Sequence, residues 1–334
     1  MTRLMTTTIL ALTMLLLGST RAPAQTIDEV FRQHVPKMRE VERYQMNVAQ
    51  KYFSEKNWKV ALSEYEKYLT LYERSGAAPY AQLKWSICMA SLRKQNTAIK
   101  EGYQSVIDYW PDSAEAKWAQ YYIGSTYRDI GRIPYAKKAL QRLIAESPKH
   151  TAAAYAMSTL QAIALDEKDN PTRVKLLKTL TFSVTRDKWN RRICEDASRS
   201  LASYYFAVAA FDDGVTSIET TYKQGPASWP QVVSHVRGPI SSMVGKEETR
   251  TRGIRLADLA LTHVKRQIPT DLSDEKSLAE ARRCHYALID LNNKALRETD
   301  VLKGYQEMIR KFGVDDEILG NLAGWYKGRD NYDE

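Results

Sequence analysis

The chain has 334 residues and a formal net charge of +9, with 49 Lys and Arg against 40 Asp and Glu. Only 15 Gly and 11 Pro occur, and no run alternates apolar and polar residues as a half-buried strand would, which excludes β-rich folds. The abundant Ala, Leu, Lys, Arg and Glu lose little side-chain freedom in a helix, so we predict an all-α fold.

The N-terminus has the three regions of a secretory signal peptide. Arg3 supplies the positive charge, residues 9–17 form the apolar core, and residues 22–24 (Ala-Pro-Ala) give the small-residue pattern before cleavage between Ala24 and Gln25. The apolar run is about half of the ~20 residues that a membrane-spanning helix needs. No cysteine that could carry a lipid anchor adjoins the cleavage point. We expect a periplasmic or secreted protein without stable membrane insertion.

The charge of the mature chain narrows the class of partner. Cleavage removes two positive charges, Arg3 and Arg21, and lowers the net charge from +9 to +7. For an exported protein the acidic counterparts are lipid head groups, cell-wall polymers or an acidic protein face. Nucleic acid is not an expected partner, because it is largely absent from that compartment. A basic but well-solvated surface explains the charge equally well.

Apolar spacing of three and four residues predicts a succession of helices. In the first half we expect them at 26–34, 37–53, 58–74, 80–93, 97–109, 113–130, 134–146, 151–165 and 170–181. In the second half we expect them at 189–211, 214–222, 229–244, 249–266, 273–291, 293–312 and 315–326.

A repeat relates the helices of the first half. The small or aliphatic positions Ala61, Ile99 and Ala136 recur at intervals of 38 and 37 residues. Helix-turn-helix units with such a period stack on one another, because one hairpin cannot bury its own apolar face. We therefore predict an α-solenoid, with a signal peptide at 1–24, repeats at 25–165 and degenerate hairpins at 166–334. The alternative is a separate helical domain that begins between residues 165 and 187.

Residues 45–148 resemble the tetratricopeptide repeat family. The third copy carries Gly124, Tyr127, Ala136 and Pro148, and the first carries Ala49, Tyr52, Ala61 and Tyr65. The second copy departs, with Ser86 or Ile87 at the small position and Gly102 near the usual aromatic. Residues 109–116 resemble repeats of bacterial envelope proteins, namely the Tol–Pal accessory coordinator and the outer-membrane assembly lipoproteins. The resemblance implies a scaffold that binds a protein or peptide on a concave face.

In that family the first helix of each repeat lines the concave groove. The resemblance therefore implies a partner-binding strip on the helix at 113–130, formed by Trp118, Tyr121, Tyr122, Ser125 and Arg128. Aromatic and arginine side chains dominate binding hot spots. The alternative is that these rings fill the seams between hairpins, as buried aromatics do in most cores.

The sequence holds no local signature of catalysis, cofactor binding or a metal site. No His-Glu-x-x-His, Gly-x-Ser-x-Gly, phosphate loop or dinucleotide motif is present. Cys88, Cys194 and Cys284 lie far apart, and no Cys-x-x-Cys pair is present. We therefore interpret them as buried small hydrophobic residues. The alternative is one disulfide, with any of the three possible pairings. We interpret the basic segments 186–192 and 246–255 as solvated helix faces, or as contacts for an anionic envelope surface.

Three hypotheses follow. The first is an envelope scaffold, not an enzyme, with no cofactor and no metal, which docks a partner peptide. The second is a helical accessory domain of machinery that modifies a cell-wall polymer. The third is a structural protein that self-assembles through its C-terminal helices.

Overall fold

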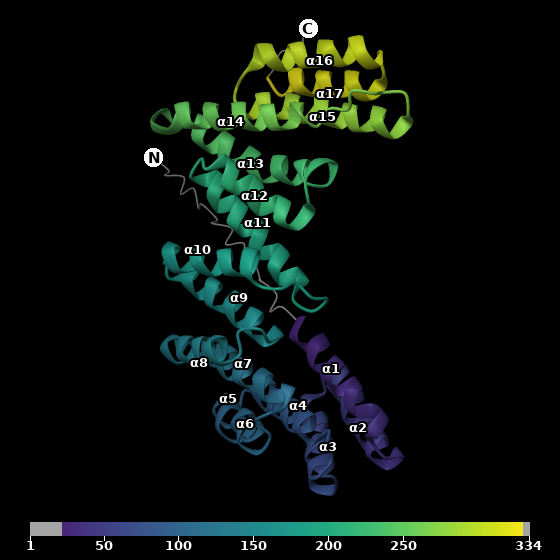
Figure 1. Cartoon of the computed structure of the whole chain (residues 1–334), viewed down its shortest axis with the longest axis vertical. Coiled ribbons are helices and arrows are strands. Elements are labelled where there is room, and N and C mark those ends of the chain that lie inside the picture. Colours follow the sequence, from purple (N-terminus) through teal and green to yellow (C-terminus); the bar gives the residue numbers. More distant parts are fainter. Residues whose placement is uncertain (1–21, 330–334) are drawn as a thin grey trace, which may run out of the picture. The chain divides into compact units, whose positions relative to one another are not determined.

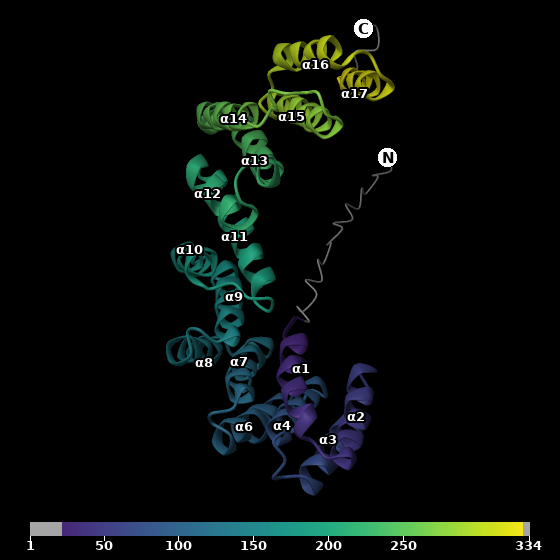
Figure 2. The same cartoon turned by 45° about the vertical axis from the view of Figure 1, so that its right-hand side comes forward.

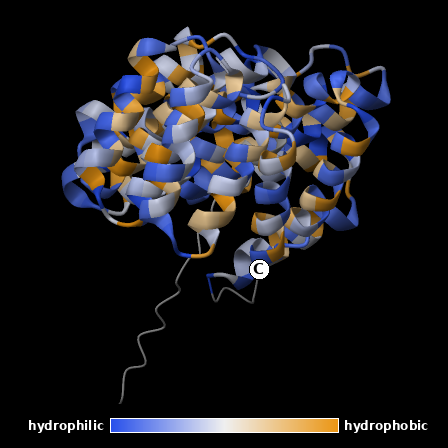
Figure 3. Cartoon of the chain, turned by 90° about the horizontal axis from the view of Figure 1, so that it is seen from below, coloured by the Kyte–Doolittle hydropathy of each residue, from blue (hydrophilic) through white to orange (hydrophobic). Residues whose placement is uncertain are grey.

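The computed structural model describes residues 22–329, and within this range every regular element is helical. The helices follow one another in neighbouring pairs (Figure 1). Hydrophobic and hydrophilic positions are interspersed along the helices (Figure 3), and helices such as α16 (Glu298–Phe312) carry an apolar stripe that packs on a neighbour. The predicted all-α fold of helical hairpins is confirmed. Residues 1–21, which hold most of the predicted signal peptide, lie outside the described residues.

The chain divides into two compact units, residues 1–126 and 127–334. The first unit contains α1 (Ala22–His34), η1 (Val35–Lys37), α2 (Glu40–Ser54), α3 (Trp58–Leu71), α4 (Ala78–Ser91), α5 (Gln95–Thr97), η2 (Ala98–Tyr103), α6 (Gln104–Tyr109) and most of α7 (Ala114–Asp129). α2 packs on α3, α3 on α4, and α4 on η2. The segments α5, η2 and α6 form one uninterrupted helix in which η2 is a π-turn.

The second unit continues the series of pairs. Its helices are α8 (Ile133–Glu146), α9 (Thr151–Asp166), α10 (Asn170–Lys178), η3 (Thr179–Ser183), α11 (Arg191–Ala207), α12 (Phe211–Tyr222), η4 (Gly225–Ala227), α13 (Trp229–Val244), η5 (Glu247–Thr249), α14 (Arg250–Lys265), α15 (Glu275–Lys294), α16 (Glu298–Phe312) and α17 (Asp316–Lys327). The pairs α11/α12, α13/α14 and α15/α16 follow one another in Figure 2. The predicted boundary at 165/166 falls at the last residue of α9, and α9 packs on α10 within this unit.

The same turn joins the two helices of most pairs. One residue takes a left-handed conformation with positive φ in each of these turns: Lys56, Arg93, Gly131, Lys168, Ala209 and Leu296. The amide of the next residue donates to the carbonyl five positions before it, for example Asn57 to Tyr52 at 2.9 Å and Ala210 to Tyr205 at 2.9 Å. This is the Schellman C-cap, which satisfies carbonyls that the ending helix leaves open. The first four turns are 37, 38 and 37 residues apart, so the repeat extends past Pro148.

Two predicted helices need correction. The helix expected at 189–211 ends at Ala207, and α12 begins at Phe211, because Ala209 turns the chain between them. Phe206 and Phe211 are thereby both buried in one core, with ring centroids 5.8 Å apart. The helix expected at 293–312 begins instead at Glu298, after a turn at Leu296. Neither turn contains the glycine or proline that would have predicted it.

The repeat positions read from the sequence lie in the core. Ala61 and Ala136 are fully buried and Ile99 is 6% exposed. The two departures in the second copy compensate each other: a Cβ atom on Gly102 would lie 2.5 Å from the Ser86 hydroxyl. A small residue on each of two facing helices lets their backbones approach closely.

Candidate functional site

The aromatic residues predicted to bind a partner pack against one another along α7. Trp118 is 1% and Tyr121 6% exposed, and their rings meet edge to face with centroids 5.9 Å apart. Tyr122 is partly buried and stacks on Tyr103 at 5.5 Å, with an interplanar angle of 11°. Ser113 begins the helix, where its hydroxyl accepts from the Ala116 amide. These rings fill the interior of the repeat, as the alternative interpretation expects.

The remaining two predicted residues are more accessible. Ser125 and Arg128 are partly exposed, and Arg128 lies beyond the end of the first unit. Trp118 and Tyr121 offer little surface to a partner in this state, so partner contact through this helix stays a prediction that concerns Tyr122, Ser125 and Arg128.

A polar hollow lies on the first helices of three successive pairs in the second unit. α13 packs between α11 and α15, and the space along this row has a volume of about 690 Å³. We call it the basic hollow and define it by its lining residues Ser203, Ser234, His235, Arg237, Gly238, Ser241, Ser242 and Lys294. Its positive charge is unopposed, because none of these residues is acidic, and Arg237 and Lys294 have no ion-pair partner within residues 22–329.

The sequence of α13 explains why this face is open. Val232, Val236 and Ile240 are fully buried on one side of the helix, while Ser234, Arg237 and Ser241 occupy the other. The amide that would donate to the His235 carbonyl belongs to a proline at 239, which has no N–H. That carbonyl therefore lacks its helical donor at the edge of the hollow.

His235 presents a defined tautomer to the hollow. Its Nδ1 lies 2.8 Å from the Gln231 carbonyl oxygen, which can only accept. Nδ1 therefore donates, and Nε2 of the neutral ring is left as an acceptor. This site was not predicted from the sequence; serine and glycine at 234, 238, 241 and 242, all on the side of α13 away from its buried valines, are the signal that points to it.

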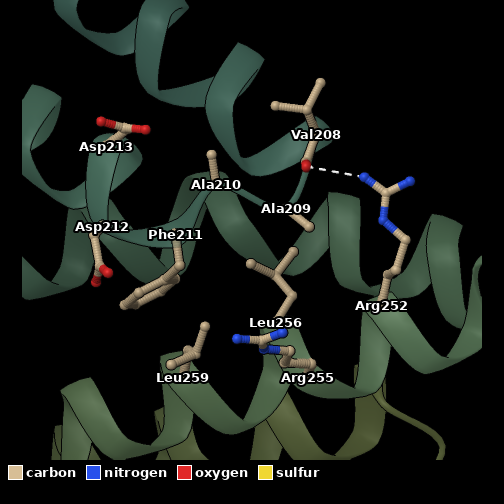
Figure 4. A pocket seen from close by; sticks show the side chains of 10 residues that line it. All are labelled: Val208, Ala209, Ala210, Phe211, Asp212, Asp213, Arg252, Arg255, Leu256 and Leu259. Carbon is tan, nitrogen blue, oxygen red and sulfur yellow. Dashed lines mark hydrogen bonds between the residues drawn. The ribbon is translucent and has the colours of Figure 1, made fainter.

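A smaller pocket of about 400 Å³ lies between the start of α12 and the side of α14 (Figure 4). Phe211, Leu256 and Leu259 form its apolar floor. Arg252 donates to the Val208 carbonyl at 3.1 Å across one wall, and the opposite wall carries Asp212. The pocket therefore balances its own charge, unlike the basic hollow.

The three buried thiols are not activated as nucleophiles. Burial raises the pKa of Cys88 to about 12 and the pKa of Cys194 and Cys284 to about 11, so these thiols stay protonated and are poor nucleophiles. All three are free, and the disulfide alternative is not present in the structure. No cluster of metal-ligating side chains is found within residues 22–329. In the same range no helix has the length and apolar character of a membrane span.

Comparison with known proteins supports the repeat. Residues 118–150 match the tetratricopeptide repeat family model, a segment that contains all five residues predicted from α7. No curated protein sequence matches the chain. The resemblance to the Tol–Pal coordinator and the assembly lipoproteins stays a prediction.

Solved structures with a similar arrangement of helices include tetratricopeptide proteins. The C-terminal part of a TPR repeat-containing protein from Cytophaga hutchinsonii is 11% identical with a TM-score of 0.46, covering 84% of this chain and 99% of that one. A tetratricopeptide repeat protein from Parabacteroides merdae is 9% identical with a TM-score of 0.40, covering 84% and 96%. The TPR domain of P58(IPK) is 11% identical with a TM-score of 0.27, covering 87% and 89%.

Proposed function

We propose that this protein is an exported scaffold of the bacterial cell envelope that binds a partner protein through the first helices of its pairs. The observation that carries the proposal is the basic hollow, where two cations that have no ion-pair partner among the described residues face an open, polar surface on three such helices. The signal-like N-terminus supports export, and the match to a tetratricopeptide repeat supports a role in protein binding.

The chemistry of the hollow favours an acidic, extended segment as its ligand. Arg237 and Lys294 attract carboxylates and suppress binding of basic segments. The small size of Ser234 and Gly238 lets a peptide backbone come close, and no neighbouring atom occupies the space that a Cβ on Gly238 would take. The His235 carbonyl and Nε2 can accept from peptide amides.

The test measures binding of a fluorescent Glu/Ser peptide and a Gln/Ser peptide of equal length to the mature protein. We expect only the acidic peptide to bind, and the double variant Arg237→Glu/Lys294→Glu to weaken it at least about tenfold, because two attractions become repulsions. The matched control Lys276→Glu/Arg310→Glu makes the same change of net charge at two exposed positions and should leave affinity within about twofold.

Two further measurements distinguish the alternatives. Co-sedimentation with purified cell wall that depends on Arg237 and Lys294, with no peptide binding, would favour the polymer-associated role. Cell fractionation and N-terminal sequencing test export directly. A mature chain that begins at Gln25 in the periplasmic or secreted fraction is expected, and an unprocessed chain in the cytoplasm would contradict the envelope assignment.

A further inference from the structure

The first unit holds its own N-terminal helix as if it were a bound ligand. α1 lies beside α4 (Figure 2) and packs through one face, where Ile27 is fully buried and Phe31 is 6% exposed. The Phe31 ring stacks on Tyr80 of α4 with centroids 4.5 Å apart. The other face of α1 carries Arg32 and is exposed. One apolar stripe therefore makes the contact.

A buried lysine under α1 depends on this contact for its counter-charge. Lys84 of α4 is 2% exposed, its Nζ lies 2.8 Å from Oδ1 of Asp28, and the Tyr80 hydroxyl donates to the same oxygen at 2.7 Å. Burial lowers the pKa of Lys84, and the Asp28 carboxylate opposes that shift. Asp28 is its only ion-pair partner within residues 22–329. Without Asp28 the buried Lys84 would lose its counter-charge, which is costly, so this site requires an acid from whatever covers it.

A second buried acidic or basic side chain contacts the C-terminal end of α1. Glu115 of α7 has a side chain that is 2% exposed, and its Oε1 lies 3.0 Å from Nε2 of His34. The site thus presents a buried cation and a buried anion. On α1, Asp28 contacts the first and His34 the second; they lie six residues apart, on either side of the buried Phe31 ring.

We propose that the site formed by Tyr80, Lys84 and Glu115 is a receptor for an amphipathic helix of a partner protein, and that α1 occupies it in the free chain. The predicted cleavage before Gln25 leaves only residues 25–34 of α1, and a helix this short is marginal by itself in water, so α1 depends on the site. Its two polar contacts are open to competitors, since the side chains of Asp28 and His34 are 46% and 25% exposed. This site lies in the first unit and is independent of the basic hollow in the second.

The geometry defines the partner. Its helix carries an aliphatic residue followed directly by a carboxylate. An aromatic residue comes three positions after the carboxylate, and a basic residue comes three positions after the aromatic one. Spaced anchors of this kind are typical of helices that bind in a groove. The order follows Ile27, Asp28, Phe31 and His34 of α1. A partner helix with this pattern competes with α1 for Lys84 and Glu115.

The experiment uses the mature full-length chain and a fluorescent peptide of residues 25–38. In the wild type the chain's own helix competes with the peptide. We expect the variant Asp28→Ala/Phe31→Ala, whose α1 holds the site weakly, to bind the peptide at least about tenfold more tightly than the wild type. Adding Lys84→Met to that variant should remove the gain, whereas Lys51→Met, at an exposed lysine of α2, should not. Equal binding to all four chains would overturn the proposal.

Hydrogen exchange of the wild type tests the proposal without any substituted protein. Saturating unlabelled peptide should accelerate exchange of the chain's own amides at 27–34 while those of α4 stay protected. Unchanged protection of α1 at saturation would show that the helix is a fixed part of the fold and would also overturn the proposal. A concentration-dependent dimer that Asp28→Asn abolishes would show that the site binds α1 of a second copy of this chain. That result would contradict the proposal of a partner protein.

Discussion

Phe206 of α11 and Gly214 of α12 meet so closely that a Cβ atom on residue 214 would lie 2.3 Å from Cε1 of the Phe206 ring. Both residues are buried, so the ring has no free space to move into. We expect Gly214→Ala to lower the free energy of unfolding by about 1–3 kcal/mol, the usual cost of overpacking a core. Urea denaturation monitored by far-UV circular dichroism measures this change.

Two comparisons show whether the contact with Phe206 is the cause. Gly320→Ala in α17, where no atom lies within 4 Å of the new Cβ, should stabilise the protein by about 0.5–1 kcal/mol. Phe206→Leu combined with Gly214→Ala should cost less than the sum of the single changes, because the smaller side chain makes room. Strict additivity would show that the strain arises elsewhere.

The left-handed turn at Lys56 predicts a stabilising substitution. Lys56 has φ of 60°, its side chain is exposed, and its Cβ is unfavourable in this conformation. We expect Lys56→Gly to raise the free energy of unfolding by about 0.5–1 kcal/mol, the net of relieved strain and the greater entropy of an unfolded glycine. Glu55→Gly, one residue earlier with φ of −74°, gains no such relief and should destabilise. A loss of stability in both variants would contradict this account of the turn.

The sequence predicts helix ends where a side chain or a glycine signals them. Asn57 and Asp315 accept from the amides of Val60 and Ile318, and Gly131 takes the left-handed position that glycine favours. The turn at Ala209 has none of these signals. It exists because two buried phenylalanines require the chain to reverse between them, and that tertiary contact leaves no local trace.

The candidate site was harder to predict than the fold. Tyrosine and tryptophan serve equally as core and as interface residues, so the sequence could not tell that Trp118 would be buried. The basic hollow arises from residues on three helices, Ser203, Arg237 and Lys294 among them, which come together only when the pairs stack. The packing of α1 on Lys84 joins residues 56 positions apart and has no periodic signal.

Arg186, at the start of the basic segment 186–192, has a structural role. Arg186 donates to the Thr221 hydroxyl at 2.9 Å and to the Thr181 carbonyl at 3.3 Å, and so joins η3 to α12. We expect Arg186→Ala to lower the free energy of unfolding by about 1–2 kcal/mol. Arg191→Ala, at an exposed residue of the same segment, should change it by less than about 0.5 kcal/mol. Equal effects would place the role of Arg186 outside these hydrogen bonds.

The three buried thiols predict a difference between native and unfolded reactivity. Burial raises the pKa of Cys88 to about 12, so almost no thiolate forms at neutral pH and the sulfur is shielded. We expect native protein to react with a thiol reagent at least about a hundredfold more slowly than protein unfolded in guanidinium. In the unfolded protein all three cysteines should react without prior reduction. Fewer than three equivalents in unreduced, unfolded protein would reveal a disulfide.

His263 predicts that stability falls with mild acidity. Its Nε2 is buried without a hydrogen-bond partner, and its ring meets Phe211 at 5.9 Å. Burial, with the charge of Arg266 nearby, lowers its pKa below the usual 6.5. As pH falls through that value the unfolded chain binds a proton that the folded chain does not, so the free energy of unfolding decreases until the lower, folded pKa is reached. His263→Gln cannot take up this proton. Urea titrations between pH 7 and 5 should therefore show a smaller loss of stability in this variant than in the wild type. The same dependence of stability on pH in both proteins would mean that His263 does not contribute to the loss.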